Sequence, residues 1–434
     1  MGLDQGEVSA AILEKITYAG VVARSFRQAE EVLEKLADLP IPEKQVERVT
    51  ERIGAERVAE RVAEVASFQA LPLTEKFAVA AGVTPPALAV VMVDGGRMQI
   101  LDRRPPREKP SPAVAEASSA GPAEPWDEDE GKESPAGHWR EDKVGLLLVM
   151  ESEASARDPC PAIPPSFVDA TRIPKLVREL KKSVKAPSEA AADGAEPEAV
   201  AEALGADTAY QPPKVGQRKV VASRARWPSF APQVAAAAWA LGFQGATRRA
   251  FVGDGSANNW TLQRRFFASF VPILDFIHAL SYVFAAAQAG RKFAVGWAYY
   301  QEWITWVWQG QVSRVIAALE ERQAELGVPD KDEAETAPRQ VVAKTLGYLR
   351  HQQDKMRYDE YRRQGLPLTS SLMESVVKQV NQRVKGTEKF WSEDGAEAIL
   401  QVRADHLSDD QPLQAFWQRR QAQETGQRRY RRTG

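Results

Sequence analysis

Hydrophobic residues recur at a helical spacing in the first part of the chain. Over residues 8–67 they return every three to four positions, which predicts amphipathic helices that Pro40 and Pro42 interrupt. Residues 46–66 hold two short helical patterns that meet at Gly54. They fit a helical hairpin, the favoured interpretation, or a helix-turn-helix that binds phosphate. The arginines available to phosphate in that alternative are Arg52, Arg57 and Arg61.

From residue 87 onward, short apolar runs are typical of buried β-strands. The expected strands cover residues 87–96, 98–102, 143–152, 249–255 and 271–276. Helical patterns over residues 232–241, 259–270 and 278–290 lie between or after the later strands. Strands mixed with helices in this order predict a mixed α/β sheet.

The C-terminal half is predominantly helical in pattern. Residues 292–365 are helical throughout, and their clustered tryptophans are expected to fill a core. Residues 368–386 form one predicted helix, which begins at Thr369 or Ser370 and ends at Gly386. The predicted units are a helical N-terminal domain (1–75), a core (86–291), a helical insertion (292–365), a return to the core (366–407) and a basic tail (408–434).

Charge is distributed unevenly along the chain. The net charge is −2, but residues 108–137 and 186–207 each carry −6, so the rest of the chain carries +10. Both segments have too little apolar surface to offset the entropy cost of ordering. We therefore expect disordered acidic inserts over 106–137 and 185–215 in a basic protein that suits a nucleic-acid partner.

Several functional classes are disfavoured by composition. The single cysteine, Cys160, excludes a disulfide framework and a cysteine-rich zinc module. The start of the chain lacks a signal-peptide pattern, and Asp275 and His278 interrupt the most apolar stretch, 266–289. We expect a cytoplasmic protein with no membrane span.

Three acidic residues occupy positions where a mixed sheet places its functional groups. Asp94 and Asp254 end predicted strands, and Glu374 lies in the first turns of the helix at 368–386. Three carboxylates in one crevice would repel, and divalent cations would remove that cost. Each residue also has a structural explanation, because Asp94 and Asp254 precede glycines in possible turns and Glu374 can pair with Lys378. The spacing of these three residues in the sequence does not by itself show that they lie together in the folded protein.

Several blocks of the sequence together resemble one family. VMVDGGRMQILD, VGDGSANNW and ILDFIHALSYV are followed by MRYDEYRRQGLPLTSSLMESVVKQVNQRVKGTEKFWSEDGAEAILQVRA. These blocks resemble the bacterial insertion-sequence transposases of the Kra group, over about residues 86–105 and 248–405. The resemblance implies a DDE enzyme with a ribonuclease H-like mixed sheet, which uses two Mg²⁺ ions, with Mn²⁺ as a substitute.

The resemblance also assigns roles to residues. It implies that Asp94, Asp254 and Glu374 are catalytic and hold the metal ions, with Asp275 and His278 in a supporting role. A local hydrogen bond between Asp275 and His278 is an equally good explanation of that pair. The implied partners are double-stranded DNA, as terminal inverted repeats and as target, and further copies of the chain assembled on DNA in the bacterial nucleoid.

Basic side chains after Glu374 are the expected DNA contacts. These are Lys378, Arg383, Lys385 and Lys389 on or beyond the helix, and Arg428 and Arg429 in the tail. For the tail, a solvated segment without a role in DNA binding is an equally good interpretation. Two further functions stay open: a catalytically inactive or domesticated DNA-binding protein, and a ribonuclease H-like nuclease without strand transfer.

Overall fold

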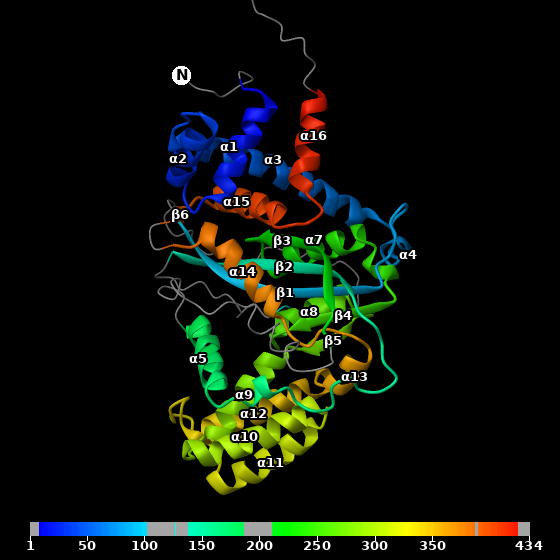
Figure 1. Ribbon diagram of the computed structural model, residues 1–434, viewed down its shortest axis with the longest axis vertical. Coiled ribbons are helices and arrows are strands. Elements are labelled where there is room, and N and C mark those ends of the chain that lie inside the picture. The colour runs from blue at the N-terminus through cyan, green and yellow to red at the C-terminus, as the bar shows by residue number, and fades with distance from the viewer. Residues whose placement is uncertain (1–7, 102–125, 127–137, 186–210, 387–388, 424–434) are drawn as a thin grey trace, which may run out of the picture.

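The computed structural model describes residues 8–101, 126, 138–185, 211–386 and 389–423 (Figure 1). Within these residues the chain is a mixed α/β protein, as predicted, with one sheet and helices around it. Most of the two predicted acidic inserts lies outside the described residues, as do Arg428 and Arg429. No helix in the described ranges combines the length and the apolar character that crossing a membrane requires.

The sheet is mixed in direction. Its main path has the order β3-β2-β1-β4-β5, in which β1, β2 and β3 pair antiparallel while β4 and β5 run parallel to β1. A short strand, β6, pairs parallel with the end of β1. The strands are β1 (Leu88–Ile100), β2 (Trp139–Glu151), β3 (Lys214–Ser223), β4 (Arg248–Gly253), β5 (Val271–Leu274) and β6 (Phe390–Trp391).

Two strand predictions need correction. The expected strands at 87–96 and 98–102 are one continuous strand, β1, because Asp94 and Gly95 pair across with Val144 and Lys143 of β2 instead of turning. β3 was not predicted, and its start at Lys214 also shortens the expected insert at 185–215. The first half of β3 is exposed or half-buried and polar, so it lacks the apolar run typical of a buried strand.

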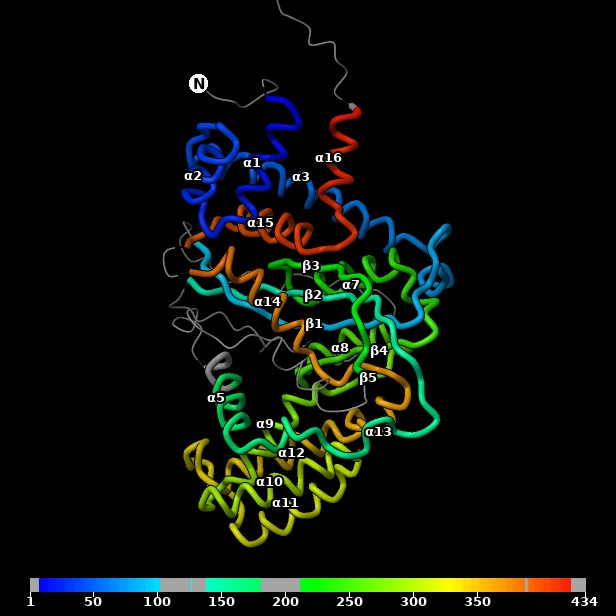
Figure 2. The backbone as a smooth tube through the Cα atoms, in the orientation of Figure 1, coloured from blue at the N-terminus to red at the C-terminus, as the bar shows by residue number. Residues whose placement is uncertain are grey.

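Helices cover the sheet and extend beyond it. α14 packs on β1, and α15 packs on both β3 and α3 (Figure 2). In the N-terminal part the helices are α1 (Ala10–Val22), α2 (Phe26–Ala37), α3 (Glu43–Ala70) and α4 (Leu73–Lys76). Those between the strands are α5 (Arg172–Lys185), α7 (Trp227–Ala240) and α8 (Ala257–Phe266). Those after β5 are α9 (Phe276–Gln288), α10 (Phe293–Trp308), α11 (Val312–Leu326), α12 (Pro338–Gln352), α13 (Tyr358–Arg363), α14 (Ser371–Val384), α15 (Glu393–His406) and α16 (Pro412–Gln423).

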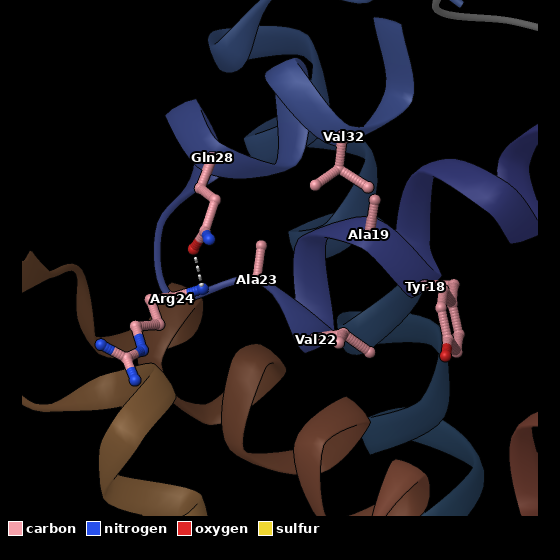
Figure 3. Close-up of a pocket in the computed structure, with 7 residues that line it drawn as sticks. All are labelled: Tyr18, Ala19, Val22, Ala23, Arg24, Gln28 and Val32. Atoms are coloured by element: carbon pink, nitrogen blue, oxygen red, sulfur yellow. Dashed lines mark hydrogen bonds between the residues drawn. The ribbon is translucent and has the colours of Figure 1, made fainter. Parts of the chain in front are cut away.

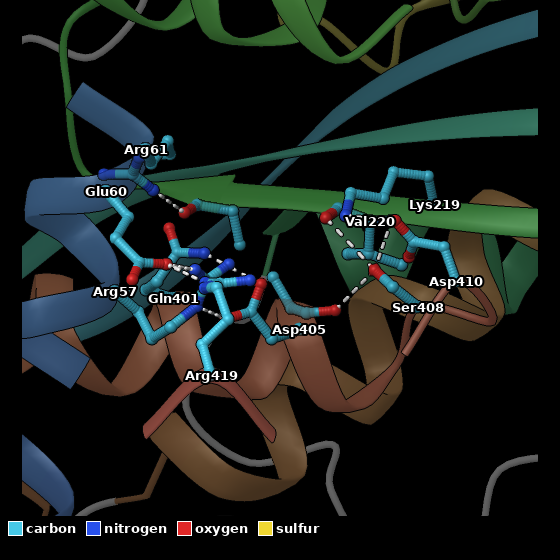
Figure 4. A network of polar contacts seen from close by, with 12 residues as sticks. Arg57, Glu60, Arg61, Lys219, Val220, Gln401, Asp405, Ser408, Asp410 and Arg419 are labelled. Carbon is cyan, nitrogen blue, oxygen red and sulfur yellow. Dashed lines mark hydrogen bonds and ion pairs between the residues drawn. The ribbon is translucent and has the colours of Figure 1, made fainter. Parts of the chain in front are cut away.

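The predicted break at Gly54 is wrong, because α3 runs through it. A Cβ atom at Gly54 would lie 2.4 Å from the carbonyl oxygen of Ala398, so this glycine permits close contact between α3 and α15. Arg57 forms a buried ion pair with Asp405 at 2.9 Å, and Arg61 pairs with Glu397 (Figure 4). Neither arginine is therefore available to phosphate, and neither a hairpin nor a helix-turn-helix exists at this position.

Most other helix predictions hold with shifted ends. α7 begins at Trp227, five residues before the expected start, with Pro228 in its first turn and Pro232 inside it. The prediction that residues 292–365 are helical throughout is wrong in its middle: the region contains α10 to α13, but residues 327–337 form a non-helical connection between α11 and α12. Trp303 and Trp308 of α10 are buried, as expected for tryptophans that fill a core, whereas Trp297 and Trp306 are half-buried.

Candidate active site

Asp94 lies within β1 at the level where the neighbouring parallel strands end. Met92 of β1 pairs in register with Val252 of β4, so Asp94 is level with Asp254, the residue that follows β4. The Asp94 side chain is half-buried and accepts a hydrogen bond from the Gly95 N–H at 2.7 Å. Burial, and then the charge of Asp254, raise the pKa of Asp94 to about 7. The strand thus holds a partly exposed carboxyl group whose pKa is raised despite the opposing charge of His278.

Asp254 is held by the start of the next helix. Its Oδ1 accepts hydrogen bonds at 2.9 Å from the Ser256 N–H and from the side-chain amide of Asn259 on α8. The same Asn259 amide donates to the carbonyl oxygen of Val93 at 3.2 Å, and Val93 precedes Asp94. One asparagine therefore ties the loop of the second carboxylate to the strand of the first.

Asp275 and His278 form a dyad at the third parallel strand. Asp275 follows β5, its Oδ1 accepts a hydrogen bond from the Ile277 N–H, and its Oδ2 lies 2.7 Å from Nδ1 of His278. This contact confirms the predicted local hydrogen bond between the two residues, while their supporting role in catalysis stays a prediction. Burial lowers the pKa of His278, but the hydrogen bond and charge of Asp275 and the charges of Asp254 and Glu374 raise it overall, to about 9. The imidazole is therefore a cation among carboxylates at neutral pH.

Glu374 lies in the first turn of α14, which packs on β1. The helix follows Ser370, as predicted, but the Ser370 hydroxyl donates to Oδ2 of Asp275 at 2.9 Å instead of capping α14. Burial, and then the charge of Asp275, raise the pKa of Glu374, whereas His278 and Lys378 lower it. Ser370 thus connects the helix that carries Glu374 to the third parallel strand.

The three predicted carboxylates therefore share one electrostatic neighbourhood. Asp254 and Glu374 both raise the pKa of Asp94, while the charge of His278 lowers it. Oxygen donors with unneutralised charge fit a hard cation such as Mg²⁺, which commonly takes one or two carboxylates and fills its other positions with water or phosphate oxygens. In the described ranges, no group of three or more His, Cys, Asp or Glu side chains is arranged to hold a metal ion.

The predicted basic contacts differ in how they are placed. Lys378 is exposed on α14. Arg383 instead lies in the core, where its Nε donates to the carbonyl oxygen of Gly20 at 2.7 Å and its guanidinium covers the ring of Phe26. It does not present its charge to DNA, because a buried arginine on an apolar helix face must be satisfied within the protein.

The two lysines at the end of α14 are partly engaged. Nζ of Lys389 donates to the carbonyl oxygens of Gln382 and Arg383, both at 3.2 Å, which satisfies the C-terminal end of the helix. Lys385 is half-buried, and burial lowers its pKa. Of the four predicted contacts on or just beyond α14, Lys378 is therefore the most accessible.

A separate hollow lies between α1 and α2 (Figure 3). It has a volume of about 270 Å³, and apolar side chains such as Tyr18, Val22 and Val32 line most of it. None of the carboxylates described above lines this hollow. It has no group that suits phosphate chemistry other than Arg24 at its edge.

Asn259, Ser370 and Tyr348 contact the site but were not predicted from the sequence. Asn259 and Ser370 lie inside the quoted family blocks, where their side-chain partners cannot be inferred from order alone. Tyr348 reaches the backbone of Asp254 from a helix 94 residues further along the chain. Comparison with known proteins adds no assignment, since no protein-family model matches the chain and no curated protein matches it.

Proposed function

We propose that the protein is a DDE transposase with a ribonuclease H-like core. The observation that carries the proposal is that Asp94 and Asp254 lie level on adjacent parallel strands while the charge of Glu374 acts on Asp94. Three antiparallel strands followed by two parallel ones, with acidic residues at the ends of β4 and β5, support a ribonuclease H-like arrangement.

The proposed chemistry is cleavage and transfer of a DNA phosphodiester. Asp94, Asp254 and Glu374 would hold two Mg²⁺ ions, or Mn²⁺ in their place, which when bound would activate water and stabilise the leaving oxygen. The carboxylate of Asp254 is oriented by the Ser256 N–H and by Asn259. His278, fixed by Asp275, offsets negative charge beside the carboxylates.

The proposed partners follow from this chemistry. Double-stranded DNA would enter as the element's terminal inverted repeats and as target, and copies of the chain would assemble on paired ends in the nucleoid. The exposed cation of Lys378, one turn beyond Glu374, would contact the DNA backbone close to the cleaved bond.

The first test of the proposal is Asp254→Asn. End cleavage in Mg²⁺ should fall by at least about 10³-fold, because a metal-holding carboxylate is lost, while DNA affinity measured in Ca²⁺ stays nearly the same. Asp354→Asn is the matched control, since Asp354 is exposed and forms a surface ion pair with its neighbour Lys355. Cleavage by the Asp254 variant at the wild-type rate would show that the assignment is wrong.

The same assay separates the alternative functions. A wild-type protein that binds ends but never cleaves them would be an inactive or domesticated DNA-binding protein. Cleavage without joined products would indicate a nuclease that lacks strand transfer. Joined products that require Mg²⁺ and all three carboxylates are the result expected of a transposase.

A further inference from the structure

Helix α12 of the helical insertion contacts the backbone beside Asp254. The Tyr348 hydroxyl donates a hydrogen bond to the carbonyl oxygen of Asp254 at 2.8 Å. One turn further on, the side-chain amide of Gln352 donates to the carbonyl oxygen of Gly255 at 3.1 Å. Two consecutive carbonyl groups of the loop after β4 are therefore satisfied by one helix.

The ring of Tyr348 is itself held in place. It stacks on Tyr282 of α9 with ring centroids 3.9 Å apart and an angle of 11° between the ring planes. The loop accommodates the ring because residue 255 is a glycine. Its φ of +103° would be strained for other residues, and a Cβ atom added there would lie 2.9 Å from the Tyr348 hydroxyl oxygen. The contact thus depends on a rigid aromatic pair on one side and on glycine on the other.

The loop is consequently held from two sides. The Ser256 N–H and Asn259 orient the carboxylate of Asp254, whereas Tyr348 and Gln352 hold the backbone that carries it. A small displacement of this backbone would move the carboxylate by a similar distance, and a misplacement of about 1 Å can cost about 100-fold in rate.

We propose that Tyr348 and Gln352 are positioning residues, through which the helical insertion fixes Asp254 for metal binding and catalysis. The role in catalysis rests on the proposed transposase function. The role in ordering the loop does not rest on it, because it concerns only the contacts between α12 and residues 254–255. Tyr348 is not assigned a contact with DNA or with the reacting atoms.

The test uses Tyr348→Phe in the full-length protein, with Tyr300→Phe as a matched control. Tyr300 is buried whereas Tyr348 is half-buried, and the Tyr300 hydroxyl also donates to a carbonyl oxygen at 2.8 Å, but the acceptor is Phe167, outside the loop. Both variants keep the aromatic ring and lose one hydroxyl hydrogen bond. A difference between the effects of the two variants therefore shows whether the hydrogen bond to the loop matters more than a similar bond elsewhere.

Three measurements are made on both variants. Tyr348→Phe should lower the maximal cleavage rate by about 10- to 100-fold and raise the Mg²⁺ concentration needed for half of that rate, with DNA affinity unchanged. Exchange of the Ser256 amide hydrogen, measured without DNA or metal, should become at least about fivefold faster, as expected for the loss of one hydrogen bond that holds the loop. Tyr300→Phe should leave all of these quantities unchanged.

The outcomes separate this inference from the proposed function. If the wild-type protein does not cleave DNA, the transposase proposal fails, and the amide exchange still decides whether Tyr348 orders the loop. Unchanged exchange in Tyr348→Phe would overturn the inference, and so would equal effects of the two variants. Faster exchange with normal cleavage and normal Mg²⁺ dependence would overturn the positioning role in catalysis.

Discussion

Among single residues, Asp142 of β2 has a buried carboxyl group that receives no hydrogen bond from another described residue. Its side chain is fully buried, and no other residue in the described part of the chain donates a hydrogen bond to either carboxyl oxygen. Oδ1 of Asn381 on α14, another buried acceptor, also lacks a partner among the described residues. Burial, with a contribution from the charge of Glu141, raises the pKa of Asp142 to about 7, although its own N–H and the charges of Lys143 and Lys385 lower it.

This arrangement predicts that Asp142→Asn stabilises the protein at alkaline pH. Because folding raises the pKa of Asp142 from 3.8 to about 7, the native state favours the protonated acid, and stability falls as pH rises from about 4 to about 7. The variant should raise the free energy of unfolding by about 1–3 kcal/mol at pH 8, and by much less at pH 5. Urea unfolding of both proteins at the two pH values measures this. A variant that is less stable at pH 8 would show that the carboxylate has a partner, such as a bound cation.

At the scale of secondary-structure elements, the contact between α3 and α15 depends on Gly54. An isolated helix gains stability when an interior glycine becomes alanine, by about 1 kcal/mol. At Gly54 the added methyl group would collide with the backbone of Ala398, so the helices would have to separate. The buried ion pair between Arg57 and Asp405 lies at the same interface and would be disturbed as well.

Gly54→Ala is therefore expected to destabilise the protein, by about 1–3 kcal/mol, although it favours the helix locally. Gly347→Ala is the matched control, because Gly347 is also inside a helix, α12, and a Cβ there would meet no atom within 4 Å. That change should stabilise the protein by about 0.5–1 kcal/mol. If the contact with α15 determines the effect, thermal and urea unfolding should show changes of opposite sign in the free energy of unfolding of the two variants. A stabilising Gly54→Ala would contradict the close packing.

At the scale of the whole molecule, the positive charge outside the acidic segments is the basis for the proposed DNA binding. Six arginines follow residue 418 in the sequence, but Arg419 and Arg420 pair with Glu60 and Glu56 of α3. The four arginines after residue 427 lie outside the described residues, and Arg428 and Arg429 are among them. These four arginines are therefore the part of the predicted tail to test as DNA contacts.

Deletion of residues 424–434 tests the tail. If its four arginines contact phosphates, the slope of log affinity against log salt should become shallower by about 2–4, since each contact contributes about 0.9. The free energy of unfolding should not change. Replacing the same arginines with glutamine keeps the length of the tail and should give the same slope. An unchanged slope would favour the solvated-tail interpretation.

Hydrophobic pattern alone was enough to predict most of the buried strands and helices, and the family blocks were enough to select the residues of the candidate site. Runs such as ALAVVMVDGG must be buried wherever they lie, and the family blocks single out Asp94, Asp254 and Glu374. Local pattern could not distinguish a turn at Asp94 from a continuous strand, because that depends on the pairing of β2. It also missed β3, whose half-exposed residues carry little hydrophobic signal.

The contacts of individual side chains depend on how the whole chain folds. In the folded protein Arg57 and Arg383 form buried interactions. The Ser370 hydroxyl donates a hydrogen bond to Asp275, and the Tyr348 hydroxyl donates one to the backbone of Asp254. These contacts join segments far apart in the chain, and hydrophobic spacing reports only that a face is covered. The identity of the covering group follows from packing of the whole chain, which no local pattern contains.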